Sequence, residues 1–485
     1  MEKCIQKTLI VLMIKVIPKK GYSEKELDDF FDSFKNQDIS WKSGKAFGAV
    51  YYPGDEYAQI ISKAYVRFLN ENAFDPQLFK SLLAMENDIV SQVANLISPE
   101  IKLHGNLTSG GTESIFLALL SARDWSKKNR QIENPEVILP STAHPAFLKA
   151  LRFLNVKAVI IHIDVLKWDL NSVENEINEN TIMLVGSAPA YPYGVIDPIS
   201  NLSELAVKHN LLLHVDACIG GFFLSYLKKM GTIVPEFNFN LPGVTSLSVD
   251  LHKYAYAPKG SSVLLYRNPE QRLSQYSVYS SWQGGIYAST TFMGTKPGGV
   301  VASTWTALNH IGDDGYLDLT KSTMSSVKKV INYIESNIHL ELIANPDMSL
   351  IAFKVKDYST YELADLLNDK GWYLGRLQNP EGIHLVVSAI HSESIVKSFT
   401  NDLDDSLAEL FSTNFRSSIQ HLGDNLLKRM LNLLPYNQLK TTLAKQAKKS
   451  NGKPSKKRII YDVKNQLSES ESNNLFRTIM DRFYS

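Results

Sequence analysis

The sequence is poor in cysteine, because its 485 residues include only Cys4 and Cys218. Two cysteines so far apart exclude a disulfide framework and a cysteine-based zinc site, so we expect a reducing compartment and chemistry carried by other residues. The sequence also lacks an excess of charge of one sign, since 51 Lys and Arg residues balance 50 Asp and Glu residues and leave a net charge of +1. No global field attracts nucleic acid, and we expect no nucleic-acid partner.

Long apolar runs are absent as well. The most apolar N-terminal stretch, residues 8–14, is interrupted by Lys15, well short of the roughly 18 residues that a membrane span needs. Pro18, Lys19 and Lys20 follow, where a signal peptide would carry a small-residue cleavage site. We therefore expect neither a transmembrane helix nor a secretory signal. The absence of a repeat every 20–50 residues excludes solenoids and propellers.

The composition that remains is typical of a globular protein, with 44% hydrophobic and 21% charged residues. Apolar residues recur every three or four positions between 78 and 96, after Asp75 and Pro76, which predicts a helix capped by Asp75. Short apolar runs then alternate with helical patterns. These runs are 137–139, 158–163, 182–185, 211–215, 245–249 and 262–266. The alternation predicts an α/β domain with a largely parallel sheet.

The second half of the chain changes character. A glycine-rich run at 284–299 shows no periodicity and predicts a long ordered loop or hinge. Beyond it, helical patterns at 316–338 and 361–370 and strand-like runs at 350–355 and 383–387 predict a smaller α+β unit. We therefore expect four parts. These are an N-terminal arm (1–55), a large domain (56–317), a small C-terminal domain (318–411) and an extension (412–485).

The C-terminal extension carries a basic segment. Residues 440–458 include eight Lys or Arg and no acidic residue, which predicts a solvated tail. Contact with an anionic membrane and a nuclear-import signal are the alternatives. A short amphipathic helix is also predicted at 426–434, and we expect it to pack on the small domain.

Two charged residues follow predicted strands. Lys253 stands beside His252 at the end of a β-rich run, where an α/β enzyme would hold a Schiff-base lysine; a surface lysine is the alternative. Asp216 follows the run 211–215, so its carboxylate lies at the end of a buried strand, where open α/β sheets bind ligands. Such a buried carboxylate needs a cationic partner, either the protonated pyridine nitrogen of pyridoxal phosphate or a structural Lys or Arg.

Two further features have the residue types that such a cofactor needs. The run Thr108-Ser-Gly-Gly111-Thr112-Glu-Ser leads into an apolar helix, so its backbone N–H groups could receive a phosphate; a plain capping box is the alternative. His144 follows a strand and could stack on a planar ring, or simply pack. The combination of phosphate loop, imidazole, carboxylate and lysine indicates a pyridoxal-phosphate site.

These motifs resemble those of the sphingosine-1-phosphate lyases, fold-type I pyridoxal-phosphate enzymes related to the group II amino-acid decarboxylases. The specific ones are Asp250-Leu-His-Lys-Tyr-Ala-Tyr-Ala-Pro-Lys-Gly and Trp282-Gln-Gly-Gly-Ile-Tyr, and the resemblance covers residues 41–407. It implies an α/β fold with a mostly parallel central sheet, helices on both faces and a smaller C-terminal α+β domain.

The resemblance also implies roles for individual residues. Lys253 would form the Schiff base, Asp216 would pair with the pyridine nitrogen, and His144 would stack on the ring. Three further residues would hold the cofactor phosphate, namely Gly111, Thr112 and His252. No metal is implied.

Other implied roles concern the substrate and a partner subunit. Gly294 and Thr295 would reach the cofactor phosphate of the other subunit in a homodimer with shared active sites. Lys259 would contact the phosphate of the substrate. Tyr191 or Tyr193 would assist proton transfer.

The implied activity is cleavage of the C2–C3 bond of a phosphorylated long-chain base, such as sphingosine 1-phosphate, by a retro-aldol route. The products would be a long-chain aldehyde and phosphoethanolamine, made by a cytosol-facing protein that is soluble or peripheral to the membrane. A decarboxylase of an aromatic or acidic amino acid needs the same cofactor residues and is the alternative, with a non-catalytic scaffold as a third reading.

Two positions depart from the pattern of this family. Lys296 stands where the family carries Arg, and Lys makes no bidentate contact with phosphate or carboxylate. Ala122 stands where many relatives carry a Tyr that reaches the substrate phosphate. Both departures bear on substrate affinity more than on cofactor binding.

Overall fold

The computed structural model describes residues 16–36, 38–163, 167–412, 461, 464 and 467–483. The chain divides into two compact units, one of Met1–Phe47, Asp357–Glu381 and Lys397–Ser485 and one of Gly48–Lys356 and Gly382–Val396. The predicted basic segment (440–458) and amphipathic helix (426–434) lie outside the described residues. The four-part division expected from the sequence follows other boundaries and stays a prediction.

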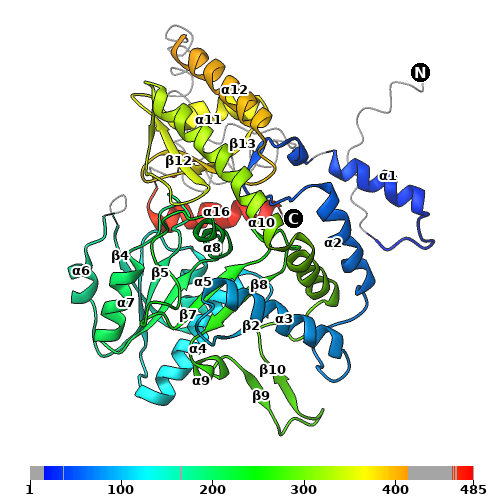
Figure 1. Cartoon of the computed structure of the whole chain (residues 1–485), viewed down its shortest axis with the longest axis vertical. Helices are drawn as coiled ribbons and strands as arrows, with labels where there is room; N and C mark the ends of the chain where they lie inside the picture. The colour runs from blue at the N-terminus through cyan, green and yellow to red at the C-terminus, as the bar shows by residue number, and fades with distance from the viewer. Residues whose placement is uncertain are drawn as a thin grey trace. The chain divides into compact units, whose positions relative to one another are not determined.

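The larger unit, Gly48–Lys356 with Gly382–Val396, is built on a seven-stranded sheet with the order β2-β8-β7-β6-β5-β3-β4 (Figure 1). Its strands are β2 (His104–Thr108), β3 (Glu136–Pro140), β4 (Lys157–Ile161), β5 (Thr181–Ser187), β6 (Leu212–Asp216), β7 (Ser246–Asp250) and β8 (Ser262–Tyr266). All six runs predicted as strands are confirmed. The seventh, β2, escaped prediction because His104, Gly105 and Asn106 give it no apolar run.

The sheet is mostly parallel, as predicted. Strands β4, β3, β5, β6 and β7 pair in parallel, whereas β8 runs antiparallel to β7 and to β2. The register places Ser187 of β5 beside Asp216 of β6, and Asp216 beside Ser248 of β7. The carboxyl ends of three neighbouring strands therefore meet at one edge of the sheet, where ligands of open α/β sheets bind.

Helices cover both faces of the sheet. Helices α4 (Gly111–Arg130) and α5 (Ala146–Leu154) pack on one face, and α3 (Lys80–Ile97), α7 (Ile199–Lys208) and α8 (Gly221–Lys229) pack on the other. Successive strand residues point to opposite faces, so Leu212 joins the core beneath α4 and α5 while Leu213 and Val215 join the other. Every residue of β6 is consequently buried.

The helix predicted after Asp75 begins later than expected. The carboxylate of Asp75 accepts the N–H groups of Gln77 and Leu78, at 2.8 and 3.3 Å, so it closes a turn that comes before α3. Helix α3 starts at Lys80, and its apolar stripe is buried at Leu82 and Ile89. The predicted first apolar position, Leu78, is exposed because it lies in that turn.

The glycine-rich run is only partly a loop. It contains β10 (Tyr287–Ser289), which pairs with β9 (Ser277–Tyr279) as an antiparallel hairpin, and it ends where α10 (Gly298–Ser336) begins. Within α10, Gly312 has a φ of 65° and interrupts the helix. The other elements of this unit are α2 (Asp55–Arg67), α6 (Leu170–Asn175), α9 (Pro269–Leu273), β11 (Leu340–Leu342), β12 (Leu350–Val355) and β14 (Gly382–Val386).

The smaller unit contains a short parallel pair, β1 (Ala46–Phe47) and β13 (Tyr373–Leu377). Its helices are α1 (Glu24–Lys35), the 3-10 turn η2 (Trp41–Ser43), α11 (Thr360–Asp369), most of α12 (Glu393–Ser412) and α16 (Glu469–Phe483). Trp372 packs against Phe47 and Phe399, and its indole N–H donates to Asp402 at 2.8 Å. The predicted helix at 361–370 and strands at 350–355 and 383–387 are confirmed as α11, β12 and β14.

Within the described ranges, no helix combines the length and the apolar content that crossing a bilayer requires.

Leu213 provides a test of the position of β6 in the core. Its side chain is fully buried, so Leu213→Ala should lower the free energy of unfolding by about 2–5 kcal/mol through lost burial and an unfilled cavity. Ile233 is 97% exposed, and Ile233→Ala should change it by less than about 0.5 kcal/mol. Urea unfolding followed by circular dichroism compares the two. Equal midpoints would contradict a central position for β6.

Candidate active site

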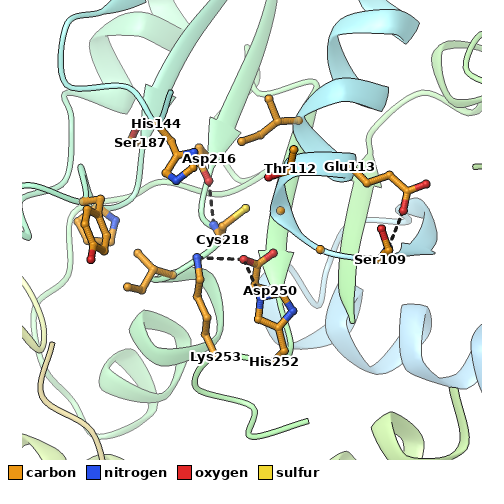
Figure 2. A pocket seen from close by; sticks show the side chains of 16 residues that line it. Ser109, Thr112, Glu113, His144, Ser187, Asp216, Cys218, Asp250, His252 and Lys253 are labelled. Atoms are coloured by element: carbon orange, nitrogen blue, oxygen red, sulfur yellow. Dashed lines mark hydrogen bonds and ion pairs between the residues drawn. The ribbon is translucent and has the colours of Figure 1, made fainter. Parts of the chain in front are cut away.

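A cavity of about 320 Å³ opens where β5, β6 and β7 end (Figure 2). It is enclosed by residues from the strand ends, from the start of α4 and from the loops after β3 and β7. Seven of the ten predicted site residues line it, namely Gly111, Thr112, His144, Tyr191, Asp216, His252 and Lys253. Residues separated by more than 140 positions in the sequence are therefore brought around one space.

The other three predicted residues lie outside the lining of this cavity. Gly294 and Thr295 lie in the loop between β10 and α10. The ammonium of Lys259 donates to the carbonyl of His252 at 3.0 Å and lies 4.9 Å from the centre of the Tyr51 ring. Burial and the nearby charge of Lys253 lower the pKa of Lys259 to about 8.

Asp216 ends β6 and is nearly buried, with 8% of its surface exposed. Its Oδ1 accepts the N–H of Cys218 at 3.1 Å, which holds the carboxylate at the cavity wall. The loop that follows needs glycine at position 220, because a Cβ there would lie 2.2 Å from the carbonyl oxygen of Ala188. This close approach keeps the loop after β6 packed against the end of β5.

Lys253 forms an ion pair with Asp250, with 2.9 Å between Nζ and Oδ2 (Figure 2). Burial would raise the pKa of Asp250, but the charges of Lys253 and His252 hold it well below its usual range. Burial would likewise lower the pKa of Lys253, but the Asp250 carboxylate raises it above the usual range. Asp250 was not predicted as a site residue, although it ends the buried strand β7 only three positions before Lys253.

The backbone beside Lys253 is firmly held. The hydroxyl of the next residue, Tyr254, donates to the carbonyl of Val387 at 2.7 Å and lies 2.5 Å from the hydroxyl of Ser349. Both contacts are buried, as is the Tyr254 ring. The lysine therefore extends from a fixed strand end into the cavity.

The start of α4 and the two residues before it, 109–113, form part of the cavity wall and are called the cradle below. Gly110 precedes the helix and no side chain caps it, so the first N–H groups of the helix are left for a ligand. A Cβ on Gly111 would lie 2.8 Å from Cys218 Sγ and 2.9 Å from Asp250 Oδ2, so glycine is required for this close packing. The hydroxyl of Thr108 lies 2.7 Å from that of Ser114 and does not cap the helix, which argues against a plain capping box.

Two aromatic residues complete the lining. His144 is exposed to the cavity, and its Nδ1 accepts the N–H of Ala146 at 3.2 Å. Of the two tyrosines considered from the sequence, Tyr191 lines the cavity and is 44% exposed, whereas Tyr193 is buried. The ring of Tyr191 lies 4.6 Å from that of the buried His384, a neighbour that no sequence motif indicated.

The cavity fits pyridoxal phosphate. No hydrogen-bond partner lies near Asp250 Oδ1 or His252 Nδ1 among the residues that the structure describes, although both atoms are buried. These unsatisfied atoms lie between the amine of Lys253 and the uncapped start of α4, where a polar ligand would meet them. No cluster of three or more His, Cys, Asp or Glu that could hold a metal ion occurs in the described part of the chain.

The two departures from the family pattern have local explanations. The ammonium of Lys296 is paired with the carboxylate of Glu86, and both side chains are nearly buried. Lys296 is therefore engaged within its own chain. Ala122 lies in the core between α4 and α5, away from the cavity.

Comparison with known proteins agrees with this geometry. The family model described as "Pyridoxal-dependent decarboxylase conserved domain" matches residues 16–356. The sphingosine-1-phosphate lyase of Oryza sativa subsp. japonica is 39% identical over 401 residues, which are 81% of this chain and 74% of that protein.

Solved structures support the same relationship. The sphingosine-1-phosphate lyase of Burkholderia pseudomallei superposes with a TM-score of 0.79 at 33% identity, covering 84% of this chain and 96% of that one. Glutamate decarboxylase of Lactobacillus brevis, at 19% identity and a TM-score of 0.71 over 81% of this chain and 94% of that one, shares the fold. Pyridoxal phosphate is accordingly the cofactor, and the chain belongs to the pyridoxal-dependent decarboxylase family and, within it, to the sphingosine-1-phosphate lyases.

Proposed function

We propose that this enzyme cleaves the C2–C3 bond of phosphorylated long-chain bases and releases a long-chain aldehyde and phosphoethanolamine. The observation that carries the proposal is that the amine of Lys253, the start of α4 and the carboxylate of Asp216 line the same cavity. Relatives at 33–39% identity are named for lysis of sphingosine 1-phosphate, which is a substrate of this class.

Different residues of the cavity would hold different parts of the cofactor. Pyridoxal phosphate, when bound, supplies an aldehyde that condenses with amines and a ring that accepts electrons from a bond breaking beside the nitrogen. Gly111, Thr112 and His252 would hold its phosphate, and His144 would lie against its ring. Asp216 would keep a proton on the pyridine nitrogen, because its buried carboxylate favours a cationic partner.

Lys253 would both bind the cofactor and move protons. Its amine must first lose the proton that Asp250 stabilises at 2.9 Å. Its amine lines the cavity beside Asp250, where, when not bonded to the cofactor, it could give or take a proton. Tyr191 is the second candidate for proton transfer, at the C3 hydroxyl, because it lines the same cavity and is partly exposed.

Lys259 would recognise the phosphate of the substrate. Its ammonium is held 3.0 Å from the carbonyl of His252, one residue from the cavity lining, and it lies against the Tyr51 ring. This position sets a second cation beside a residue of the cavity lining while leaving the amine of Lys253 for the chemistry.

The proposal includes a homodimer with shared active sites. The hairpin β9–β10 and the residues after it expose large apolar side chains, namely Val278, Tyr279, Trp282, Ile286 and Phe292. Exposed apolar patches of this kind mark protein interfaces. Gly294 and Thr295 follow directly, so a partner seated on this patch would lie beside the loop that the resemblance assigns to the partner's cofactor phosphate.

We also propose that the protein faces the cytosol. A reducing compartment suits a chain with two cysteines, one of which, Cys218, is a buried thiol beside Asp216. Contact of the basic segment (440–458) with anionic lipid, the alternative to a solvated tail, belongs to the same proposal.

The function is tested by replacing Lys253. Lys253→Ala should lower aldehyde release from sphingosine 1-phosphate by roughly a thousandfold or more, because the variant loses its general acid–base group and its cofactor linkage. Lys321→Ala, at an exposed position of α10, is the matched control and should retain activity. Release of carbon dioxide from aromatic or acidic amino acids without aldehyde from the phosphorylated base would instead identify a decarboxylase.

The ion pair with Asp250 predicts how cofactor capture depends on pH. Because the pKa of Lys253 is raised, its amine is mostly protonated at neutral pH, and capture of added cofactor should accelerate as pH rises. Asp250→Asn removes the stabilising charge, so the same acceleration should occur at lower pH. Borohydride trapping of the cofactor on Lys253 measures the rate. An identical pH profile in Asp250→Asn would contradict the coupling, and Asp313→Asn, which lies outside the cavity lining, serves as control.

The lowered pKa of Lys259 predicts a second pH effect. Lys259 loses its charge as pH passes about 8, so the KM for the phosphorylated base should rise above that pH while the substrate phosphate stays fully ionised. Lys259→Arg should keep the KM flat across the same range, and Lys259→Gln should raise it about tenfold at pH 7. Steady-state kinetics between about pH 6.5 and 9.5 tests this. A rise in KM that persists in Lys259→Arg would contradict the assignment.

A further inference from the structure

The loop between β10 and α10 is pinned at Met293, immediately before Gly294 and Thr295. The N–H of Met293 donates to Glu113 Oε1 at 3.0 Å. Its carbonyl accepts the hydroxyls of Ser289 and Thr291 at 3.3 and 3.2 Å. Both polar groups of this backbone position are therefore engaged, and the contact with Glu113 joins the loop to an element that lies 180 residues earlier in the chain.

The same loop is pinned again at Lys296, immediately after Thr295. Its ammonium lies 2.6 Å from Glu86 Oε2, and the two side chains are 11% and 12% exposed. Its carbonyl accepts the N–H of Ala73 at 2.9 Å. Gly294 and Thr295 thus lie between two anchored positions, one held by Glu113 and one held by Glu86.

Glu113 is also part of the cradle at the start of α4. It lines the cavity with 8% of its surface exposed, and its Oε2 accepts the N–H of Ser109 at 2.6 Å (Figure 2). This bond to Ser109 uses only one oxygen of the carboxylate. The other oxygen, Oε1, accepts the N–H of Met293, so a single carboxylate joins the cradle to the loop.

We propose that Glu113 is a positioning residue that couples the two active sites of the dimer. The inference rests on the proposed function, in which the cradle serves the cofactor of its own subunit and Gly294 and Thr295 serve that of the partner. Glu113 orders both segments with the same carboxylate. A phosphate bound to one cradle fixes Glu113 and hence the loop that completes the other site, and by linkage the effect is reciprocal.

Two consequences follow for cofactor binding. Binding to the two sites should be positively cooperative, because the first cofactor orders the loop required by the second. Glu113→Gln should weaken binding about tenfold and abolish the cooperativity, since the amide offers one acceptor oxygen and sets an NH₂ against the second N–H. Glu86→Gln loosens the same loop without touching the cradle, so it should weaken binding but retain the cooperativity.

Mixed dimers test the coupling across the interface. One chain is unaltered, and the other carries Lys253→Ala, so that only the unaltered chain can condense with pyridoxal phosphate. Its affinity is read from the visible absorbance of that condensed cofactor. Adding Glu113→Gln to the Lys253→Ala chain should weaken the unaltered site about tenfold, although its own cradle is intact.

Gly294→Asp in the Lys253→Ala chain is the reference for a shared site. A Cβ at Gly294 would come no closer than 3.7 Å to Tyr287, so a side chain can begin there without a clash, and its carboxylate would repel the phosphate of the unaltered site. If Gly294→Asp weakens that site and Glu113→Gln does not, the coupling by Glu113 is wrong while the shared site stands. If Gly294→Asp has no effect, the shared site itself is wrong.

Hydrogen exchange gives a readout that needs no cofactor. In the protein stripped of pyridoxal phosphate, Glu113→Gln should accelerate exchange in the segment 290–296 and in the segment 108–112, because both lose a bond to the carboxylate. Acceleration in the cradle segment alone would overturn the proposal, since it would leave Glu113 with a capping role only.

Discussion

The parallel pairing of β5, β6 and β7 is the constraint on which the site depends. Ser187, Asp216 and Ser248 are register partners in successive strands, so the three strands end at nearly the same level. The ends of these strands and the loops that follow them carry nine of the sixteen residues that line the cavity. This register matters for the site, because a slip of β6 by one residue would turn the side chain of Asp216 to the opposite face of the sheet.

Two largely buried lysines of the larger unit are each paired with a carboxylate, one within the same turn and one on a distant element. Lys253 pairs with Asp250, three positions earlier in the sequence, and Lys296 pairs with Glu86, more than 200 positions earlier. A buried charge without a partner is strongly unfavourable, so each pair fixes the backbone segments that carry it. The pair at Lys253 differs in one respect, because the cavity beside it allows the lysine to exchange its partner for a cofactor.

The sequence was sufficient to predict six of the seven strands of the large sheet, because buried strands are continuous apolar runs. Polar residues at the strand ends, together with the family motifs, indicated seven residues of the cavity. Prediction from the sequence failed where a local pattern is compatible with two structures or where a strand has no apolar pattern. Asp75 caps a turn as readily as a helix, and the polar strand β2 has no apolar pattern. The glycine-rich run concealed a hairpin, since Tyr287 and its neighbours pair with β9 only in three dimensions. The bridging contact of Glu113 with Met293 links residues 180 positions apart, and no spacing in the sequence indicates it.

The anchoring of Tyr254 has a kinetic consequence for its neighbour. Its hydroxyl bonds fix the backbone beside Lys253, so the amine can change position only by rotation about the bonds of its own side chain. Rotations of exposed side chains take picoseconds to nanoseconds, but the amine of Lys253 must also break its ion pair with Asp250 before it can move. The motion of the lysine is therefore governed by this ion pair and by its own side-chain bonds, while the backbone that carries it stays in place.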